Sequence, residues 1–227
     1  LIETDHHWEF VDEQISTDNL NPETEVLSVF ITSAVTAEII NALPKLRLIA
    51  CRSTGFNNID LNAAAAKGIA VENVPTYGDQ TVAEYAFTLL LALSRKLPEA
   101  INSYDKNVPV ENMRGWDLKG KTLGVIGSGH IGQCAIKIAN GFGMNVIAFD
   151  PYPNEQVADE LGFKYVELDE IFINSDAITI HAPYFPSNHH IVNAEKLALM
   201  KPTAVLVNTA RGELVDTKAL ADAMSQN

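Results

Sequence analysis

The residues best placed to do chemistry are three glycines in the segment VIGSGHIGQ, at positions 127, 129 and 132. A G-x-G-x-x-G turn can hold the diphosphate of a dinucleotide when a strand precedes it, a helix follows it and an acid stands about 20 residues further on. Here TLGVIG predicts the strand, 131–142 predicts the helix, and Asp150 ends the next apolar run, 18 positions after Gly132. The spacing therefore predicts a dinucleotide site, with a plain strand, turn and helix containing chance glycines as the alternative.

Each of these residues has a physical role in such a site. Gly127 permits a tight turn, Gly129 lets the backbone approach the diphosphate, and Gly132 lets the helix pack close to the sheet. Free N–H groups and the positive end of the helix dipole then face the phosphates. Asp150 can accept hydrogen bonds from both hydroxyls of the adenine ribose, and it would repel a 2′-phosphate. The predicted cofactor is therefore NAD rather than NADP.

The elements that must position this turn alternate along the chain. Short apolar runs predict strands at 25–30, 46–52, 69–74, 122–127, 145–150, 176–183 and 203–210. Helical patterns lie between them at 36–43, 59–68, 81–96, 131–142, 155–161 and 215–224. The alternation predicts an α/β fold with parallel sheets. The segment 97–119 holds two prolines and little periodicity, so we expect it to be an arm that links two domains.

Composition excludes several classes of function. The chain has 227 residues, a formal net charge of −13 and a pI near 4.8, which argues against nucleic-acid binding because that needs clustered Lys and Arg. No apolar stretch approaches the roughly 20 residues of a membrane helix. Cys51 and Cys134 stand far apart in apolar contexts, typical of reduced thiols in a cytoplasmic protein. His189 and His190 have no evident Cys or carboxylate partner, so we predict a solvated loop there and no metal site.

Four segments carry a more specific pattern: RSTGFNNID (52–60), NVPTYGDQTVAEYAFTLLLALSR (73–95), DLKGKTLGVIGSGHIGQ (117–133) and MKPTAVLVNTARGELVDTKAL (200–220). Together they resemble the D-isomer-specific 2-hydroxyacid dehydrogenases, most of all the D-lactate dehydrogenase branch, in the family's order and spacing from about residue 25 onwards. The resemblance implies two doubly wound domains with the active site in the cleft between them. A flavodoxin-like substrate domain would occupy 1–96, and an NAD-binding Rossmann domain 97–227.

The resemblance also implies roles for matching residues. Backbone N–H groups of Thr54 and Gly55 would hold the substrate carboxylate and Tyr77 would hydrogen-bond it, with an ordinary turn and a packed aromatic as the alternatives. Arg211 would be the catalytic arginine, whose planar guanidinium can clamp a 2-oxo acid and stabilise charge on its carbonyl oxygen; a surface ion pair is the alternative. The implied cofactor contacts are Gly127, Gly129, His130, Ile131, Gly132, Asp150, His181, Ala182, Pro183, Thr209, Ala210 and Arg211.

The chain departs from the family's pattern in two places. The family usually has a threonine after the proline at 183, where Tyr184 and Phe185 stand here. The family's acid/base histidine and its glutamate follow the NTARG segment, and none of the six histidines of this chain stands in that context. We therefore interpret the chain as a fragment of a longer dehydrogenase, trimmed at both ends, with its Rossmann domain incomplete at the C-terminus.

These features predict an NAD-dependent oxidoreductase that interconverts a 2-oxo acid and a D-2-hydroxy acid, with pyruvate and D-lactate as the best match. A dehydrogenase acting on phosphoglycerate, glyoxylate or hydroxypyruvate is one alternative. A non-catalytic NAD(H)-sensing protein on the same scaffold is another. The helix at 81–96 and the arm after it match the family's dimer region, so the resemblance implies a homodimer.

Overall fold

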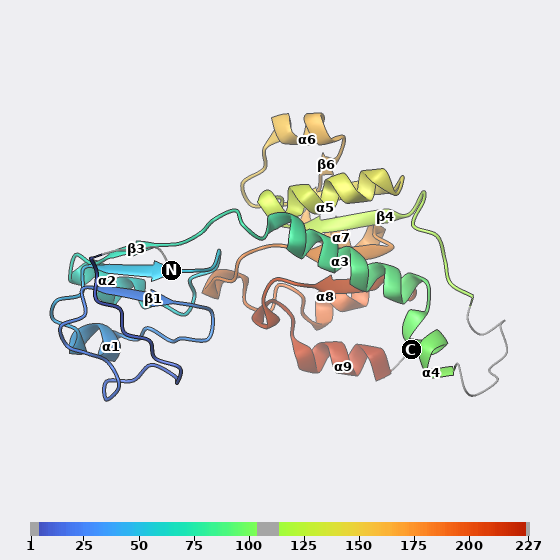
Figure 1. The fold of residues 1–227 in the computed structure, drawn as a ribbon. Helices are drawn as coiled ribbons and strands as arrows, with labels where there is room; N and C mark the ends of the chain where they lie inside the picture. The colour runs from blue at the N-terminus through green and yellow to red at the C-terminus, as the bar shows by residue number, and fades with distance from the viewer. Residues whose placement is uncertain (1–4, 104–113, 226–227) are drawn as a thin grey trace. The chain divides into compact units, whose positions relative to one another are not determined.

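The chain forms two compact units, Leu1–Tyr77 and Gly78–Asn227 (Figure 1). The computed structural model describes residues 5–103 and 114–225. The boundary between the units lies before the expected domain boundary at residue 96. The reason is that helix α3 (Asp79–Ser94) packs against α5 (His130–Gly141) within the second unit. The middle of the expected arm, residues 104–113, lies outside the described residues.

The first unit is built on a parallel sheet with the strand order β1-β2-β3. Its elements in chain order are β1 (Val26–Val29), α1 (Ala37–Ala42), β2 (Leu48–Cys51), α2 (Leu61–Ala66) and β3 (Ala70–Glu72). The side chains of Thr36 and Asp60 cap the two helices by accepting hydrogen bonds from the N–H groups of Ile39 and Ala63. A flavodoxin-like strand order needs more strands than these three, so it stays a prediction.

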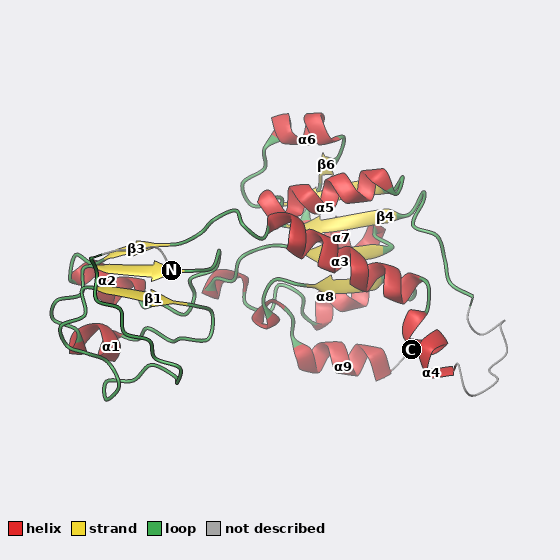
Figure 2. Cartoon of the chain, in the orientation of Figure 1, coloured by secondary structure: helices red, strands yellow, loops and turns green. Residues whose placement is uncertain are grey.

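The second unit holds a five-stranded parallel sheet in the order β6-β5-β4-β7-β8 (Figure 2). Its remaining elements are α4 (Leu97–Ser103), β4 (Thr122–Ile126), β5 (Asn145–Phe149), α6 (Glu155–Leu161), β6 (Lys164–Tyr165), α7 (Leu168–Asn174), β7 (Ala177–Ile180), α8 (Ala194–Leu199), β8 (Val205–Asn208) and α9 (Thr217–Ser225). Counted within this unit the strand order is 3-2-1-4-5, as in doubly wound dinucleotide-binding sheets. The predicted α/β fold with parallel sheets is confirmed.

Helices cover both faces of this second sheet (Figure 1). Along β4, Leu123 and Val125 belong to the core shared with α3 and α5. Ile126 instead packs with Ile171 and Phe172 of α7, in a core that α8 and α9 also join. A parallel sheet is buried on both faces, which explains why its strands read as continuous apolar runs rather than as alternating patterns.

Four elements of the second unit, α4, β6, α7 and α8, were missed in the sequence. Helix α4 lies at the start of the segment expected to be an arm. Strand β6 has two residues, too few to show a period, and it is defined by its pairing with β5. Helices α7 and α8 do carry local signals. Glu167 and Glu170 form a capping box at the start of α7, and the Asn193 side chain caps α8 by accepting a hydrogen bond from the Lys196 N–H (3.0 Å).

Helix α3 buries one face rather than its whole circumference. Ala83, Phe87 and Leu90 are buried, whereas Tyr85 and Leu93 are exposed. Its sequence is apolar nearly all round, but only one side of the helix meets the sheet and α5. Within residues 5–103 and 114–225, no helix has both the length and the apolar character needed to cross a membrane.

Candidate active site

The glycine turn connects β4 to α5, and its three glycines meet different surroundings. Gly127 has φ +93°, and a Cβ there would lie 2.7 Å from the Ala182 backbone nitrogen. A Cβ on Gly132 would lie 2.1 Å from the carbonyl oxygen of Gly127. On Gly129 a Cβ would meet nothing within 4 Å. Two glycines are therefore required by packing, whereas Gly129 leaves open space above the turn.

The N-terminus of α5 presents unpaired backbone donors to that open space. Gly129 is the N-cap, and no side chain caps the helix. The first backbone hydrogen bond of the helix runs from the Gln133 N–H to the Gly129 carbonyl (2.9 Å). The N–H groups of Gly129, His130 and Ile131 have no acceptor in the part of the chain that the structure describes. Such donors, at the positive end of a helix dipole, suit a diphosphate.

Asp150 follows β5 directly, and its carboxylate reaches back to the glycine turn. Its Oδ2 accepts hydrogen bonds from the N–H (2.8 Å) and the hydroxyl (3.0 Å) of Ser128. Its Oδ1 accepts a hydrogen bond from the Tyr152 N–H (2.9 Å). The Ser128 hydroxyl also lies 2.8 Å from the Tyr165 hydroxyl on β6. The structure thus brings the predicted acid to the predicted turn, and it adds Ser128 and Tyr165, which the sequence analysis missed.

The loop at 181–183 follows β7 and lies against the turn. The His181 N–H donates to the Ile126 carbonyl (2.8 Å), and Ala182 is the residue that a Cβ on Gly127 would strike. The Nε2 atom of His181 lies 3.0 Å from the Thr179 hydroxyl. Burial lowers the pKa of the His181 imidazole to about 4. The ring is therefore neutral at physiological pH.

This low pKa makes stability depend on pH. An unfolded histidine titrates near 6.5, so between pH 6.5 and 4 the unfolded chain binds the extra proton and the free energy of unfolding falls as the pH drops. Going from pH 7.5 to pH 5, we expect His181 to contribute a loss of about 2 kcal/mol. Urea unfolding of wild type and His181→Gln at both pH values measures it. Equal losses in the two proteins would contradict the prediction.

Arg211 stands just after β8, in a segment fixed by Asn208. The Asn208 side chain accepts a hydrogen bond from the Ala210 N–H (3.0 Å) and donates one to the Arg211 carbonyl (2.7 Å). The exposed Arg211 guanidinium donates to the Ala210 carbonyl (2.9 Å). Thr209 holds a buried hydroxyl with no hydrogen-bond partner among the described residues. A buried orphan hydroxyl beside the predicted nicotinamide ribose position fits a site that receives a polar ligand.

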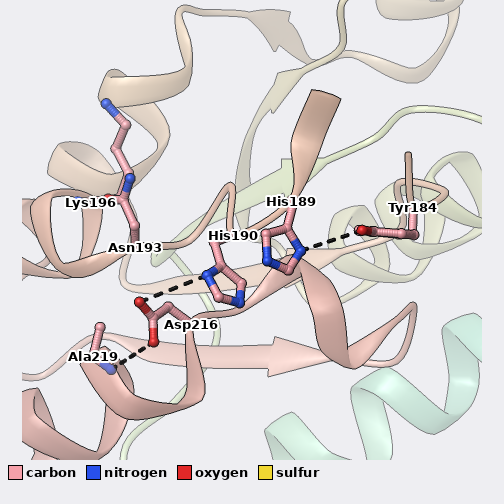
Figure 3. Close-up of polar contacts among 7 residues, drawn as sticks. All are labelled: Tyr184, His189, His190, Asn193, Lys196, Asp216 and Ala219. Carbon is pink, nitrogen blue, oxygen red and sulfur yellow. Dashed lines mark hydrogen bonds and ion pairs between the residues drawn. The ribbon is translucent and has the colours of Figure 1, made fainter. Parts of the chain in front are cut away.

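A second segment supports the chain after Arg211. The N–H groups of His190 and Val192 donate to the carbonyls of Glu213 and Leu214, each at 3.0 Å. The His190 Nδ1 lies 3.8 Å from the Asp216 Oδ2 (Figure 3), and the imidazoles of His189 and His190 stack 3.8 Å apart. A hydrogen bond from the Ala219 N–H lowers the pKa of the Asp216 carboxyl. Both histidines lie in a turn, with His189 exposed and His190 half-buried, and the structure adds the stacking of their rings and the contact of His190 with Asp216.

In the first unit, the loop after β2 is tied to the chain after β3. The Asn73 side chain donates to the Thr54 carbonyl (2.8 Å), and the Thr54 hydroxyl donates to the Val74 carbonyl (3.0 Å). The buried Ser53 hydroxyl donates to the Gly55 carbonyl (2.7 Å). Across the described residues, the N–H groups of Thr54 and Gly55 have no acceptor. This loop can therefore offer two backbone donors to an anion. Tyr77 ends the unit with an exposed side chain.

Comparison with known proteins places these features in one family. Residues 87–227 match the D-isomer specific 2-hydroxyacid dehydrogenase, NAD binding domain. The D-lactate dehydrogenase of Escherichia coli is 39% identical over 203 residues, which cover 88% of this chain and 61% of that protein. The D-3-phosphoglycerate dehydrogenase of Methanocaldococcus jannaschii is 41% identical over 206 residues, covering 90% of this chain and 39% of that protein.

A solved structure points to the same family. The crystal structure of D-lactate dehydrogenase from Aquifex aeolicus complexed with NAD and lactic acid is similar with a TM-score of 0.85 and 36% identity, covering 93% of this chain and 64% of that one. The chain spans less than two thirds of the length of each of these three proteins. It belongs to the D-isomer specific 2-hydroxyacid dehydrogenase family.

Proposed function

We propose that this chain acts in the NAD-dependent interconversion of a 2-oxo acid and a D-2-hydroxy acid, with pyruvate and D-lactate as the substrate pair. The proposal rests on the residues that lie together at one edge of the five-stranded sheet. There the carboxyl ends of β4, β5 and β8 lead into the glycine turn, Asp150 and Arg211. Open α/β sheets bind ligands at this edge, and a nucleotide site beside a guanidinium suits the reduction of an anionic carbonyl compound.

The residues of the second unit fit NAD. The unpaired N–H groups at the start of α5 would hold the diphosphate, and Gly129 leaves room for it. Asp150 would accept hydrogen bonds from the adenine ribose and would repel a 2′-phosphate. His130, Ile131 and the loop at 181–183 would line this half of the site, and Thr209 and Ala210 would lie beside the nicotinamide ribose. When bound, NADH supplies the hydride.

Anion-binding groups would hold the substrate. The Thr54 and Gly55 N–H groups suit a carboxylate, and Tyr77 would add a hydroxyl donor. The Arg211 guanidinium would bridge the carboxylate and the carbonyl oxygen of a 2-oxo acid, which orients the substrate. The same group would stabilise the negative charge that develops on that oxygen during reduction. A histidine paired with a glutamate would move the proton, as the family pattern implies.

The experiment is a two-step assay on the complete natural protein that contains these residues. NADH binding is measured by fluorescence titration, and NADH oxidation is then followed with pyruvate, hydroxypyruvate, glyoxylate and a phosphorylated 2-oxo acid. We expect pyruvate to give the highest kcat/KM. If kcat/KM is higher with another of these acids, that acid is the substrate in place of pyruvate. NADH binding without turnover on any acid would favour the NAD(H)-sensing alternative, and failure to bind NADH would overturn the proposal.

The substrate loop offers a more local prediction. Asn73→Ala removes the donor that holds the Thr54 carbonyl, so the two backbone N–H groups are no longer prealigned. We expect KM for the 2-oxo acid to rise about fivefold to tenfold, the equivalent of one hydrogen bond, with NADH affinity unchanged. Asn145→Ala is the matched control, because it removes a similar hydrogen bond, to the Gly120 carbonyl, in the second unit. Equal KM values in the two variants would refute the role of Asn73.

We also propose that the protein is a homodimer. Exposed apolar side chains gather along α3 and α4, namely Tyr85, Leu93, Leu97 and Ile101. These helices lie in the part of the chain that matches the family's dimer region, and a run of exposed apolar residues of this kind is typical of a protein interface.

A further inference from the structure

We infer that Tyr165 and Ser128 form a relay that orients the Asp150 carboxylate for the adenine ribose. Both are positioning residues, acting through Asp150 rather than on the reacting atoms. The inference rests on the proposal that the second unit binds NAD, and it goes beyond that proposal by naming the groups that make the acid effective.

The direction of the hydrogen bonds follows from counting protons. The Ser128 hydroxyl has one proton, and it is donated to Asp150 Oδ2 at 3.0 Å because a carboxylate can only accept. The Tyr165 hydroxyl, 2.8 Å from the Ser128 oxygen, must therefore be the donor in that contact. The order is Tyr165 to Ser128 to Asp150, and each hydrogen bond polarises the next one.

The packing of the sheet holds the two ends of the relay in place. In the pairing of β6 with β5, Tyr165 lies opposite Ala148, and Ala148 stands two residues before Asp150. Its ring packs edge-on against Phe163, with centroids 5.0 Å apart. Ser128 is buried within the glycine turn, and its own N–H is the second donor to Oδ2. The sheet and the turn thus set the backbone positions from which both hydroxyl groups extend.

The relay determines which part of the carboxylate remains available. A carboxylate offers about four acceptor positions. Ser128 occupies two positions on Oδ2, and the Tyr152 N–H occupies one on Oδ1. Oδ1 thus keeps one acceptor position, enough for one ribose hydroxyl rather than for the two that the sequence suggested. Without the relay the Asp150 carboxylate could rotate. Ribose binding would then have to restrict the orientation of the carboxylate, which weakens binding.

The test compares variants of the relay on NADH and on NADH analogues that lack the 2′- or the 3′-hydroxyl of the adenine ribose. Tyr165→Phe keeps the ring and removes only the hydroxyl, and Ser128→Ala removes the middle member. We expect each variant to weaken NADH binding about fivefold. With at least one deoxy analogue, the variants should bind as tightly as the wild type does, because that analogue lacks the hydroxyl that donates a hydrogen bond to Asp150. Ser225→Ala, which removes an exposed hydroxyl at the end of α9 outside the relay, is the control.

The same experiment separates the effect of the charge of Asp150 from the effect of its orientation. Asp150→Asn removes the charge, so it should narrow the preference for NADH over NADPH. Tyr165→Phe retains the charge, and NADPH should still bind more weakly than NADH. An equal loss on NADH and on both analogues would show a merely structural role and overturn the relay, as would an unchanged affinity in Tyr165→Phe. If the wild type fails to bind NADH at all, the proposed function fails instead.

Discussion

Replacing Arg211 with alanine is expected to lower kcat/KM for the 2-oxo acid by about a thousandfold, the scale on which a donor to developing negative charge acts. NADH affinity should fall far less, although Arg211 is also among the implied cofactor contacts. The guanidinium would bind the substrate carboxylate and stabilise charge on the carbonyl oxygen, so its loss weakens both binding and the transition state. Steady-state kinetics and NADH titration of the complete natural protein measure the two effects. The side chain is exposed, so the folded state should keep its stability.

Two further variants sharpen this prediction. Arg211→Lys keeps the charge but loses the planar fork, and we expect it to recover only part of the activity. Arg47→Ala is the matched control, because Arg47 is an exposed arginine in an ion pair with Glu25 in the first unit. Full activity in Arg211→Ala, or a comparable loss in Arg47→Ala, would remove Arg211 from its proposed role.

The second large effect is expected at Gly132. In Gly132→Ala the added Cβ would lie 2.1 Å from the Gly127 carbonyl oxygen, a backbone atom that cannot move aside without opening the turn. We expect the free energy of unfolding to fall by about 3 kcal/mol, the cost of overpacking a close contact. NADH binding should be lost together with it, since the same displacement moves the N–H groups of α5. Urea unfolding and fluorescence titration measure the two quantities.

Gly129→Ala separates binding from stability. Its added Cβ meets nothing within 4 Å, and its φ of −66° suits any residue. The free energy of unfolding should therefore stay near that of the wild type, while NADH binding weakens at least about tenfold because the methyl group would occupy space that the diphosphate needs. If Gly129→Ala binds NADH as the wild type does, the diphosphate does not lie over this glycine.

Local patterns made much of the fold predictable. The central strands β4 and β7 of the second sheet are buried on both faces, so each appears as a short apolar run with its own boundaries. Gly127 needs a positive φ and Gly132 a close contact, and both requirements leave glycine in the sequence. Strand β6 gave no such signal, because two residues show no period and only the pairing with β5 makes them a strand.

The candidate site was predictable only as a set of separate positions. Arg211 stands in a recognisable segment, but its support by Asn208 and by the segment at 190–192 appears only in the folded chain. Ser128 occupies a variable position of the glycine pattern, and Tyr165 lies 37 positions away. No periodicity connects such a pair, since their contact depends on the strand order.

By itself, the sequence determined the α/β class, the strand, glycine turn and helix with an acid after the next strand, and the resemblance to the D-2-hydroxyacid dehydrogenases, because each depends on residues close together along the chain. Only the tertiary structure decided that α3 packs in the second unit, that Asp150 meets Ser128 and Tyr165, and that His181 has a low pKa. These properties come from contacts between distant segments and from the exclusion of water, and the local spacing of residues predicts neither of them.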